Sequence, residues 1–157
     1  MAFLSRLIRK SILTTSIIAQ QSTFTMTLAM SSSIPLSSKY QHISISAAGY
    51  SDVNGIYKPK HASVIPGGFD RTCREMRWDT QMLWNQLADK NVPWYEAPNE
   101  SYIYRNKGDG KWWIDGPSGA GVYIAKSDEL LPPKRGWVAL SSDYEPLPII
   151  DILEGEL

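Results

Sequence analysis

The chain has little of what several common classes of small protein depend on. Its 157 residues include one cysteine, which excludes an intrachain disulfide and a structural zinc site built from several thiolates. Its 16 basic and 16 acidic residues cancel, so it lacks the net positive charge on which nucleic-acid binding depends. No run reaches the roughly 18 consecutive apolar residues of a membrane span. We therefore predict one ordinary domain, with no nucleic-acid partner and no transmembrane segment.

Acidic residues are also missing from residues 1–51, about the first third of the chain. Asp52 is the first acidic residue. This stretch is rich in Ser and Thr, contains no Trp, and has Tyr40 as its first Tyr. Its basic residues are Arg6, Arg9, Lys10 and Lys39. A basic, hydroxyl-rich and acid-free composition is typical of an organelle transit peptide. We predict that residues 1–39 are a cleavable targeting presequence or a disordered tail, followed by a single domain over 40–150 and a C-terminal tail over 151–157.

The destination of such a presequence is open between organelles. Near the N-terminus, apolar residues recur at helical spacing and basic residues share much of the other side, which makes the short cationic amphipathic helix read by mitochondrial import receptors. The alternative is a secretory signal, with residues 6–10 as its charged region and 12–19 as its apolar core, followed by a plastid-transit stretch. Hydroxyl side chains at 14–16 lower the hydrophobicity of that core. We predict a mitochondrial location, with a plastid or secretory route as the alternative.

From about residue 40 the pattern changes to short alternations of apolar and polar residues separated by Gly, Pro and Asn, which is typical of β-strands. Residues 42–46 alternate with period two, and the Asn54-Gly55 pair predicts a tight type I′ turn. Further strands are predicted at 94–95, 101–105, 111–115, 122–126 and 136–140. Their spacing of about ten residues predicts a mainly β fold, a small antiparallel β-sandwich or partly open barrel.

One inserted α-helix is predicted within this β domain, at about residues 71–88. The segment contains no Gly or Pro and carries apolar residues at roughly helical spacing. Thr72 followed by Glu75 fits a capping box, and Asp70 is a second candidate cap.

Aromatic residues, glycines and prolines recur in a fixed order across the domain. The order is Gly49, Val53-Asn54-Gly55-x-Tyr57, Trp94-Tyr95, Tyr102-Ile103-Tyr104, Trp113-Ile114, Tyr123-Ile124, Pro132-Pro133-x-x-Gly136-Trp137, Pro146 and Pro148. Over residues 43–150 this order resembles a small aromatic-rich β module of algal, oomycete and other protist proteins. The resemblance implies a fold unit and a source lineage, but no reaction. The predicted helix is then an insertion between Tyr57 and Trp94.

Residue types that carry catalysis are scarce. His42 and His61 lie about twenty residues apart, without the spacing that places two imidazoles on one helix face, so we predict no metal site and no cofactor. Ser118 lies in a glycine-rich stretch, which we interpret as a hairpin loop rather than the turn of a nucleophile. Cys73 lies between two arginines, whose charges favour the thiolate, and its reactivity is left open.

Aromatic residues are the strongest feature of the domain, with six Trp and eight Tyr, all from residue 40 onward. Adjacent residues on a strand point to opposite sides of the sheet, so one of each aromatic pair is expected to face outward. Exposed contiguous apolar surface marks a binding site. We predict an aromatic platform drawn from Trp94, Tyr95, Tyr102, Tyr104, Trp112, Trp113 and Tyr123. Trp112→Ala and Trp113→Ala are then expected to affect binding at one position and stability at the other.

The platform and the helix lead to three functional hypotheses. Arg71, Arg74 and Arg77 recur every third residue along the helix and form a basic stripe, which together with the aromatic face suits a protein partner. We predict a non-catalytic accessory or assembly module of an organelle that binds such a partner. The alternative is a carbohydrate-binding β module, since exposed rings also stack on sugars. A small hydrolase-like enzyme is the third hypothesis.

Overall fold

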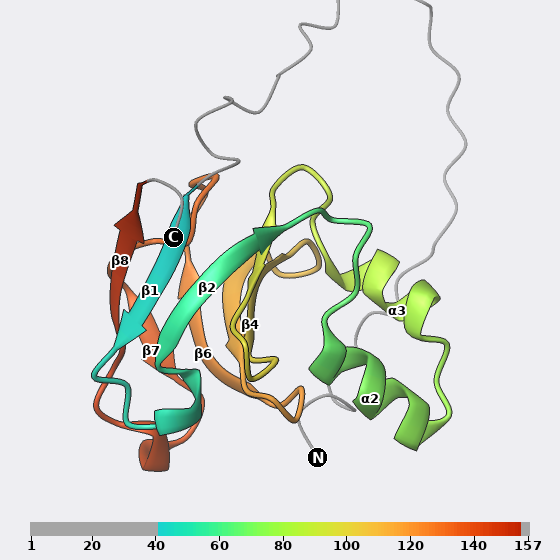
Figure 1. Ribbon diagram of the computed structural model, residues 1–157, viewed down its shortest axis with the longest axis horizontal. Helices are drawn as coiled ribbons and strands as arrows, with labels where there is room; N and C mark the ends of the chain where they lie inside the picture. Colours follow the sequence, from blue (N-terminus) through green and yellow to red (C-terminus); the bar gives the residue numbers. More distant parts are fainter. Residues whose placement is uncertain (1–40, 155–157) are drawn as a thin grey trace, which may run out of the picture.

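The computed structural model describes residues 41–154, so the predicted presequence and the last three residues lie outside the described residues. Eight strands and two α-helices follow one another along this part of the chain (Figure 1). The strands are β1 (His42–Ser46), β2 (Gly55–Lys60), β3 (Trp94–Glu96), β4 (Tyr102–Asn106), β5 (Lys111–Asp115), β6 (Gly121–Lys126), β7 (Trp137–Ala139) and β8 (Ile149–Leu153). The helices are α2 (Gly67–Met76) and α3 (Thr80–Leu87), with short 3-10 helices η2 (Ser51–Val53) and η3 (Ser142–Tyr144).

The strands form one antiparallel sheet in the order β7-β6-β5-β4-β3-β2-β1-β8. The sheet curls into a half-barrel whose two free edges are β7 and β8, and both α-helices are inserted between β2 and β3 (Figure 1). This confirms the predicted mainly β fold, in its form as a partly open barrel. β8 extends into the stretch predicted as a C-terminal tail, because residues 151–153 belong to the strand.

The inserted helical segment is two helices rather than the single predicted helix over 71–88. The chain leaves α2 at Arg77, whose φ of 56° lies in the left-handed region where helices commonly end. Asp79 then caps α3, because its carboxylate accepts a hydrogen bond from the backbone N–H of Met82 at 2.8 Å. An N-cap in the middle of an otherwise helical pattern therefore divides the segment.

The residues predicted to cap the helix have other roles. Thr72 and Glu75 lie inside α2, so the predicted capping box does not form. The hydroxyl of Thr72 donates to the carbonyl of Ser118 at 2.7 Å and ties α2 to the β5–β6 loop. Asp70, in the first turn of α2, pairs with Arg74. Neither these helices nor any other helical stretch in residues 41–154 has the length and hydrophobicity to cross a bilayer.

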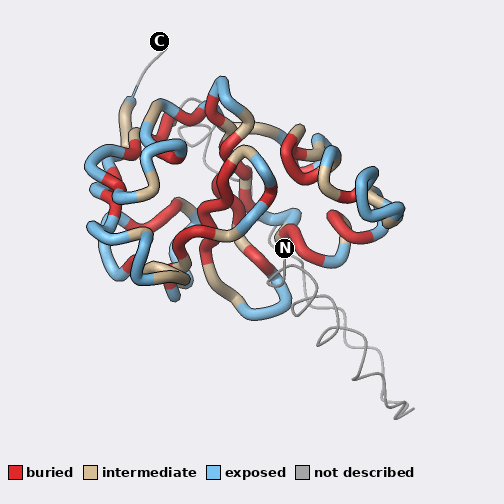
Figure 2. The backbone as a smooth tube through the Cα atoms, turned by 90° about the horizontal axis from the view of Figure 1, so that it is seen from below, coloured by how far each residue is buried: buried red, intermediate tan, exposed pale blue. Residues whose placement is uncertain are grey.

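The sheet separates two hydrophobic cores. The barrel core, inside the curl, contains Ile43, Ile45, Tyr57, Tyr95, Ile103, Trp112, Ile114, Tyr123, Trp137 and Ile150. The helix-side core, between the sheet and the two helices, contains Phe69, Cys73, Leu83, Trp84, Leu87, Trp94, Tyr102, Tyr104 and Trp113. Figure 2 shows the buried stretches gathered in the middle of the molecule, with exposed residues on the outer turns of the helices. Side chains on alternate positions of the central strands therefore enter different cores.

The connection between β1 and β2 is longer than the predicted two-residue turn. Asn54 has a φ of −72°, so it lacks the positive φ of a type I′ turn. Its side chain bonds both backbone groups of Ala48, accepting from the N–H at 3.0 Å and donating to the carbonyl at 3.2 Å. The asparagine side chain thus closes a wider loop.

One end of the barrel depends on Gly49. Its N–H donates to the carbonyl of Pro146 at 2.8 Å, and a Cβ at this position would lie 2.0 Å from a backbone oxygen of the β7–β8 connection. This close approach requires glycine. The hydroxyl of Tyr123 adds a second tie, since it accepts from the N–H of Tyr50 at 3.1 Å and donates to the carbonyl of Tyr144. These contacts hold the β1–β2 and β7–β8 connections together.

Candidate functional site

The aromatic residues predicted as an exposed platform are buried, each at most 5% exposed. Three of them lie in the barrel core, namely Tyr95, Trp112 and Tyr123. Four lie in the helix-side core, namely Trp94, Tyr102, Tyr104 and Trp113. The alternation of side chains is as expected, but the prediction that one of each pair faces solvent is wrong, because both sides of these strands are covered.

Trp84 of α3 is the centre of the packing that covers the second side of the sheet. Its ring centroid lies 5.2 Å from that of Phe69, 5.4 Å from Tyr104 and 5.8 Å from Trp94. Its indole N–H donates to the carbonyl of Ala62 at 3.3 Å. Tilted and edge-on ring contacts of this kind are favourable beyond the area that they bury. The inserted helices therefore convert the predicted platform into a core.

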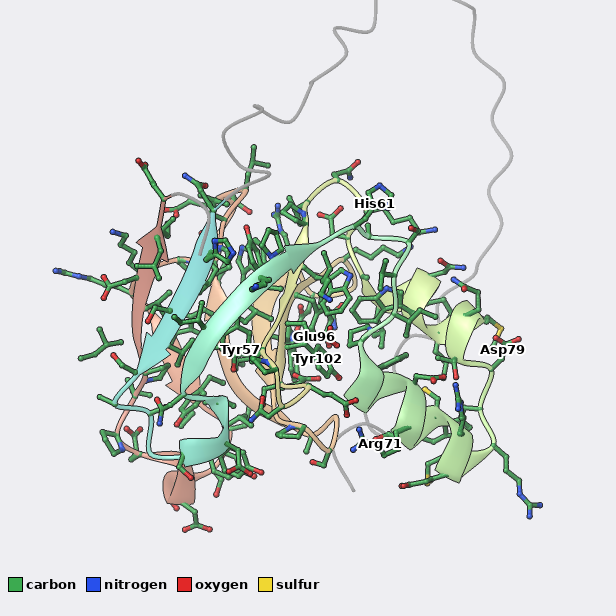
Figure 3. All side chains as sticks on the ribbon, viewed as in Figure 1. Tyr57, His61, Arg71, Asp79, Glu96 and Tyr102 are labelled. Atoms are coloured by element: carbon green, nitrogen blue, oxygen red, sulfur yellow. The ribbon has the colours of Figure 1, made fainter. Side chains whose placement is uncertain are left out.

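A carboxylic acid lies in this helix-side region. Asp115 ends β5 where the β5–β6 register shifts, and it is 1% exposed. Burial raises the pKa of Asp115 to about 7, although the neighbouring Tyr102 hydroxyl favours the ionised form. Burial also raises the pKa of Tyr102 well above its usual value. Neither Asp115 Oδ1 nor the Tyr102 hydroxyl has a well-formed hydrogen bond to any described residue. Figure 3 shows Tyr57 and Tyr102 in the middle of the molecule and Asp79 at the helix pair.

The position of Asp115 limits its chemistry to binding and releasing a proton. Its burial keeps substrates from reaching it while α2 and α3 cover the sheet. The sequence places Asp115 at the end of the strand predicted over 111–115 but does not identify it as a titrating group, because its burial depends on segments distant in the chain. The available signal was its spacing, since Asp115 is two residues after Trp113 and strand alternation directs both to one side.

The arginines predicted as a basic stripe lie on the exposed part of α2 and its end, but two of them are paired within the chain. Arg71 forms an ion pair with Glu100, and Arg74 forms one with Asp70. Among the described residues Arg77 forms no ion pair. Exposed pairs of this kind contribute little stability, yet they reduce the positive charge that an acidic partner would meet.

A groove of about 550 Å³ lies beside the N-terminus of α2. Glu96 accepts a hydrogen bond from the N–H of Gly67 at 3.1 Å and pairs with Lys60 at 3.2 Å. The carboxylate of Glu100 lies against Gly67 as well. Figure 3 shows Glu96 on the sheet and Arg71 on the adjoining helix. The two carboxylates occupy the place where an external anion would meet the positive end of the helix.

Cys73 is buried rather than activated. Burial raises the pKa of its thiol, a side-chain hydrogen bond with Thr80 partly offsets this rise, and the charge of Asp70 adds to it. The flanking arginines, whose charges favour the thiolate, therefore do not lower the pKa of this thiol below its ordinary value. No group of three metal-ligating side chains occurs among residues 41–154.

Each edge strand of the sheet carries one exposed apolar side chain, while other exposed apolar residues of the described part lie on β2, on the helices and in loops. Val138 on β7 is 58% exposed and Ile149 on β8 is 56% exposed. Ile56 on β2 is also exposed, and it lies opposite Ser44 of β1. Ser46 of β1 is on the same side of the sheet as Ser44, and it lies opposite Ile149. The outer side of β2, β1 and β8 therefore carries two exposed isoleucines around two small serines. Figure 1 shows the helices on the opposite side of the molecule from β8.

Comparison with protein-family models, with curated proteins and with solved structures gives no match to this chain. The resemblance to the aromatic-rich protist module therefore stays a prediction.

Proposed function

We propose that this protein is a non-catalytic protein-binding module, an accessory or assembly subunit that holds a partner protein at the edges of its sheet. The observation that carries the proposal is the exposure of branched apolar side chains on both edge strands, Val138 on β7 and Ile149 on β8. Fully burying an exposed side chain of this size contributes roughly 1.5–3 kcal/mol, and a partner that covers these two, which are just over half exposed, gains about half of that at each. Contiguous exposed apolar surface is typical of interaction sites, and on the outer side of the sheet beside β8 the exposed Ile149 and Ile56 lie on either side of small serines of β1.

The edges replace the aromatic face as the contact surface. Stacking on sugars needs exposed ring faces, and the rings predicted for that purpose are in the two cores, so carbohydrate binding loses its support. A hydrolase needs an acid or nucleophile that the substrate can reach. Asp115 on β5 and Cys73 on α2 are both buried, which removes support from the hydrolase hypothesis.

The acid-free, basic composition of residues 1–51 supports placing this module in an organelle, with mitochondria as the first destination and a plastid or secretory route as the alternative. The full chain with a C-terminal tag, expressed in cells of its own lineage, tests this by imaging and by sequencing of the mature N-terminus. Cleavage between about residues 20 and 40 together with an organelle signal supports import. An intact N-terminus in the cytosol contradicts it.

Site-specific photo-crosslinking tests the protein-binding proposal. A photoreactive amino acid is placed singly at Ile149, at Val138, at Met82 on α3, and at the exposed Lys134 as a control position. The full-length variants are then irradiated in an extract of the source organism. We expect a discrete adduct at one or both edge positions that excess unlabelled native domain prevents, and none at Lys134.

The outcomes separate the possible surfaces. An adduct at Met82 with none at either edge keeps a protein-binding function but moves it to the helix pair. The absence of any competed adduct at all of these positions contradicts the protein-binding proposal itself. Chemically denatured domain serves as the competitor control, because it should leave a specific adduct unchanged.

A further inference from the structure

β8 is an edge strand with no strand on its outer side in the described part of the chain. It pairs with β1 in a register that joins His42 to Leu153 and Ser46 to Ile149, and the sheet order ends there. Figures 1 and 2 both show the helices on the opposite side of the molecule from this edge. Alternate N–H and C=O groups along the outer edge of β8 are therefore free to pair with another extended segment.

The side chains of β8 divide between the two sides of the sheet. Ile150 is in the barrel core, and Ile152 packs against that core. On the outer side Ile149 and Asp151 are exposed, and Leu153 is half-buried. A strand added in register with β8 would therefore meet apolar side chains except at its centre, where it meets the carboxylate of Asp151.

The charge around β8 selects the chemistry of that strand. From residue 136 to the C-terminus the chain contains no Lys or Arg. The acidic residues in the described part of this stretch are Asp143, Glu145, Asp151 and Glu154. Opposite charges directly across an antiparallel ladder stabilise the pairing, and like charges destabilise it. A segment with a basic side chain opposite Asp151 is therefore favoured.

The same carboxylate disfavours a second copy of this chain as the occupant. Full-length antiparallel pairing of two β8 strands places Asp151 directly opposite the same residue of the other copy. Charged side chains on edge strands commonly prevent self-association in this way. Pro148 immediately before the strand has no N–H to donate, which also limits extension of the pairing.

We infer that β8 is a strand-addition site, which takes an extended segment of a partner protein with a Lys or Arg flanked on each side by apolar residues. The inference rests on the proposed function and narrows it to one edge and one partner chemistry. Main-chain hydrogen bonds to β8 supply affinity, and Asp151 supplies specificity.

Two synthetic peptides test this inference. Each has the sequence Ser-Thr-Val-Val-X-Val-Val-Thr-Ser with blocked ends, and X is Lys in one and Glu in the other. They are titrated into the isotope-labelled full chain, and amide chemical shifts are followed by NMR. We expect the Lys peptide to shift the amides of β8 and β1, and to bind about fivefold or more tightly than the Glu peptide.

Charge reversal in the protein supplies the matched test. Asp151→Lys should invert the preference between the two peptides, and Asp151→Asn should remove it. Asp143→Lys adds the same charge outside the strand and should leave the preference for the Lys peptide in place, if the pairing across β8 rather than the overall charge decides it. N-methylation of the peptide along the edge that faces β8 should abolish binding, whereas N-methylation along its other edge should not.

Three results would overturn the inference. The first is that Asp151→Lys still prefers the Lys peptide over the Glu peptide. The second is that the peptide shifts amides outside β8 and β1 instead. The third is that β8 amides shift with protein concentration in the absence of peptide, which would identify a second copy as the occupant. If any of these results is found together with a photo-adduct at Val138 or Met82 that excess native domain prevents, the protein-binding function is still supported. The absence of adducts at every position instead contradicts that function directly.

Discussion

Trp112 and Trp113 are adjacent in β5, and their indole rings lie in two different hydrophobic cores. The N–H of Trp112 donates to the carbonyl of Glu129 at 3.3 Å, on the barrel side. The N–H of Trp113 donates to the carboxylate of Asp109 at 3.1 Å, on the helix side. Strand alternation makes the two rings point to opposite sides of the sheet. The curl of the sheet buries Trp112, and the inserted helices bury Trp113.

Trp112→Ala and Trp113→Ala are each expected to destabilise the domain, because each leaves a large cavity in a core. The expected loss is about 3–5 kcal/mol per substitution, measured by urea unfolding. This differs from the expectation drawn from sequence, in which one of the two positions affects binding and the other stability. Val138→Ala, on an exposed edge position, is the control and should change the unfolding free energy by less than about 0.5 kcal/mol. A tryptophan variant as stable as the wild type would contradict the burial described here.

Local patterns were sufficient to predict most of the strands and the mainly β fold, but not β8, which extends into the predicted C-terminal tail. Period-two alternation marks β1, and the Gly-rich stretches before and after β5 mark where strands turn. Alternation also predicts that Trp112 and Trp113 point apart. It carries no information about what lies beyond each face, which depends on segments distant in the chain. The covering of the second face by Trp84 could therefore not be predicted from β5 itself.

Local signals failed where a side chain serves a distant contact. The Asn54-Gly55 pair reads as a turn, but the amide of Asn54 is engaged with Ala48. The apolar spacing over 71–88 predicts one helix, but Asp79 caps a second helix within this segment. Exposure of the β8 edge was beyond sequence reasoning as well, since it follows from the order of the strands in the sheet.

Asp79→Ala is expected to destabilise the domain by about 1 kcal/mol, because the N–H of Met82 loses its acceptor at the start of α3. Asp79→Asn keeps an oxygen at the same place and should retain most of the stability. Urea unfolding of the two variants beside the wild type measures the difference. Equal stability of all three would show that the cap contributes nothing to the holding of α3 on the sheet.

Cys73 should react slowly with thiol reagents in the folded protein. Its side chain is fully buried and its pKa is raised by that burial, so both access and thiolate formation are suppressed. We expect labelling about 100-fold or more slower than in the urea-unfolded chain, at a rate set by local opening of α2. Thiol release followed by absorbance gives both rates. Labelling at the same rate in both states would contradict the packing of α2 against the sheet.

The stability of the domain should fall as pH rises through the range in which Asp115 titrates. The usual pKa of this side chain is 3.8, which applies to the unfolded chain, and its pKa in the folded domain is about 7. Between these values the unfolded chain has released the proton while the folded domain retains it, so raising the pH favours unfolding. The destabilisation is absent below about pH 4 and complete above about pH 7, and it totals about 4 kcal/mol.

Asp115→Asn isolates this contribution, because the amide keeps the shape of the acid but cannot ionise. Urea unfolding between pH 4.5 and pH 8 should show the variant gaining about 3 kcal/mol relative to the wild type as the pH rises. Asp143→Asn removes an exposed carboxylate and should follow the wild-type profile in parallel. Parallel profiles for wild type and Asp115→Asn would mean that the carboxyl is ionised in the folded domain. Water or a moved polar group would then have to stabilise that charge, and the helix-side core would be more open than the packing of Trp84 against the sheet allows.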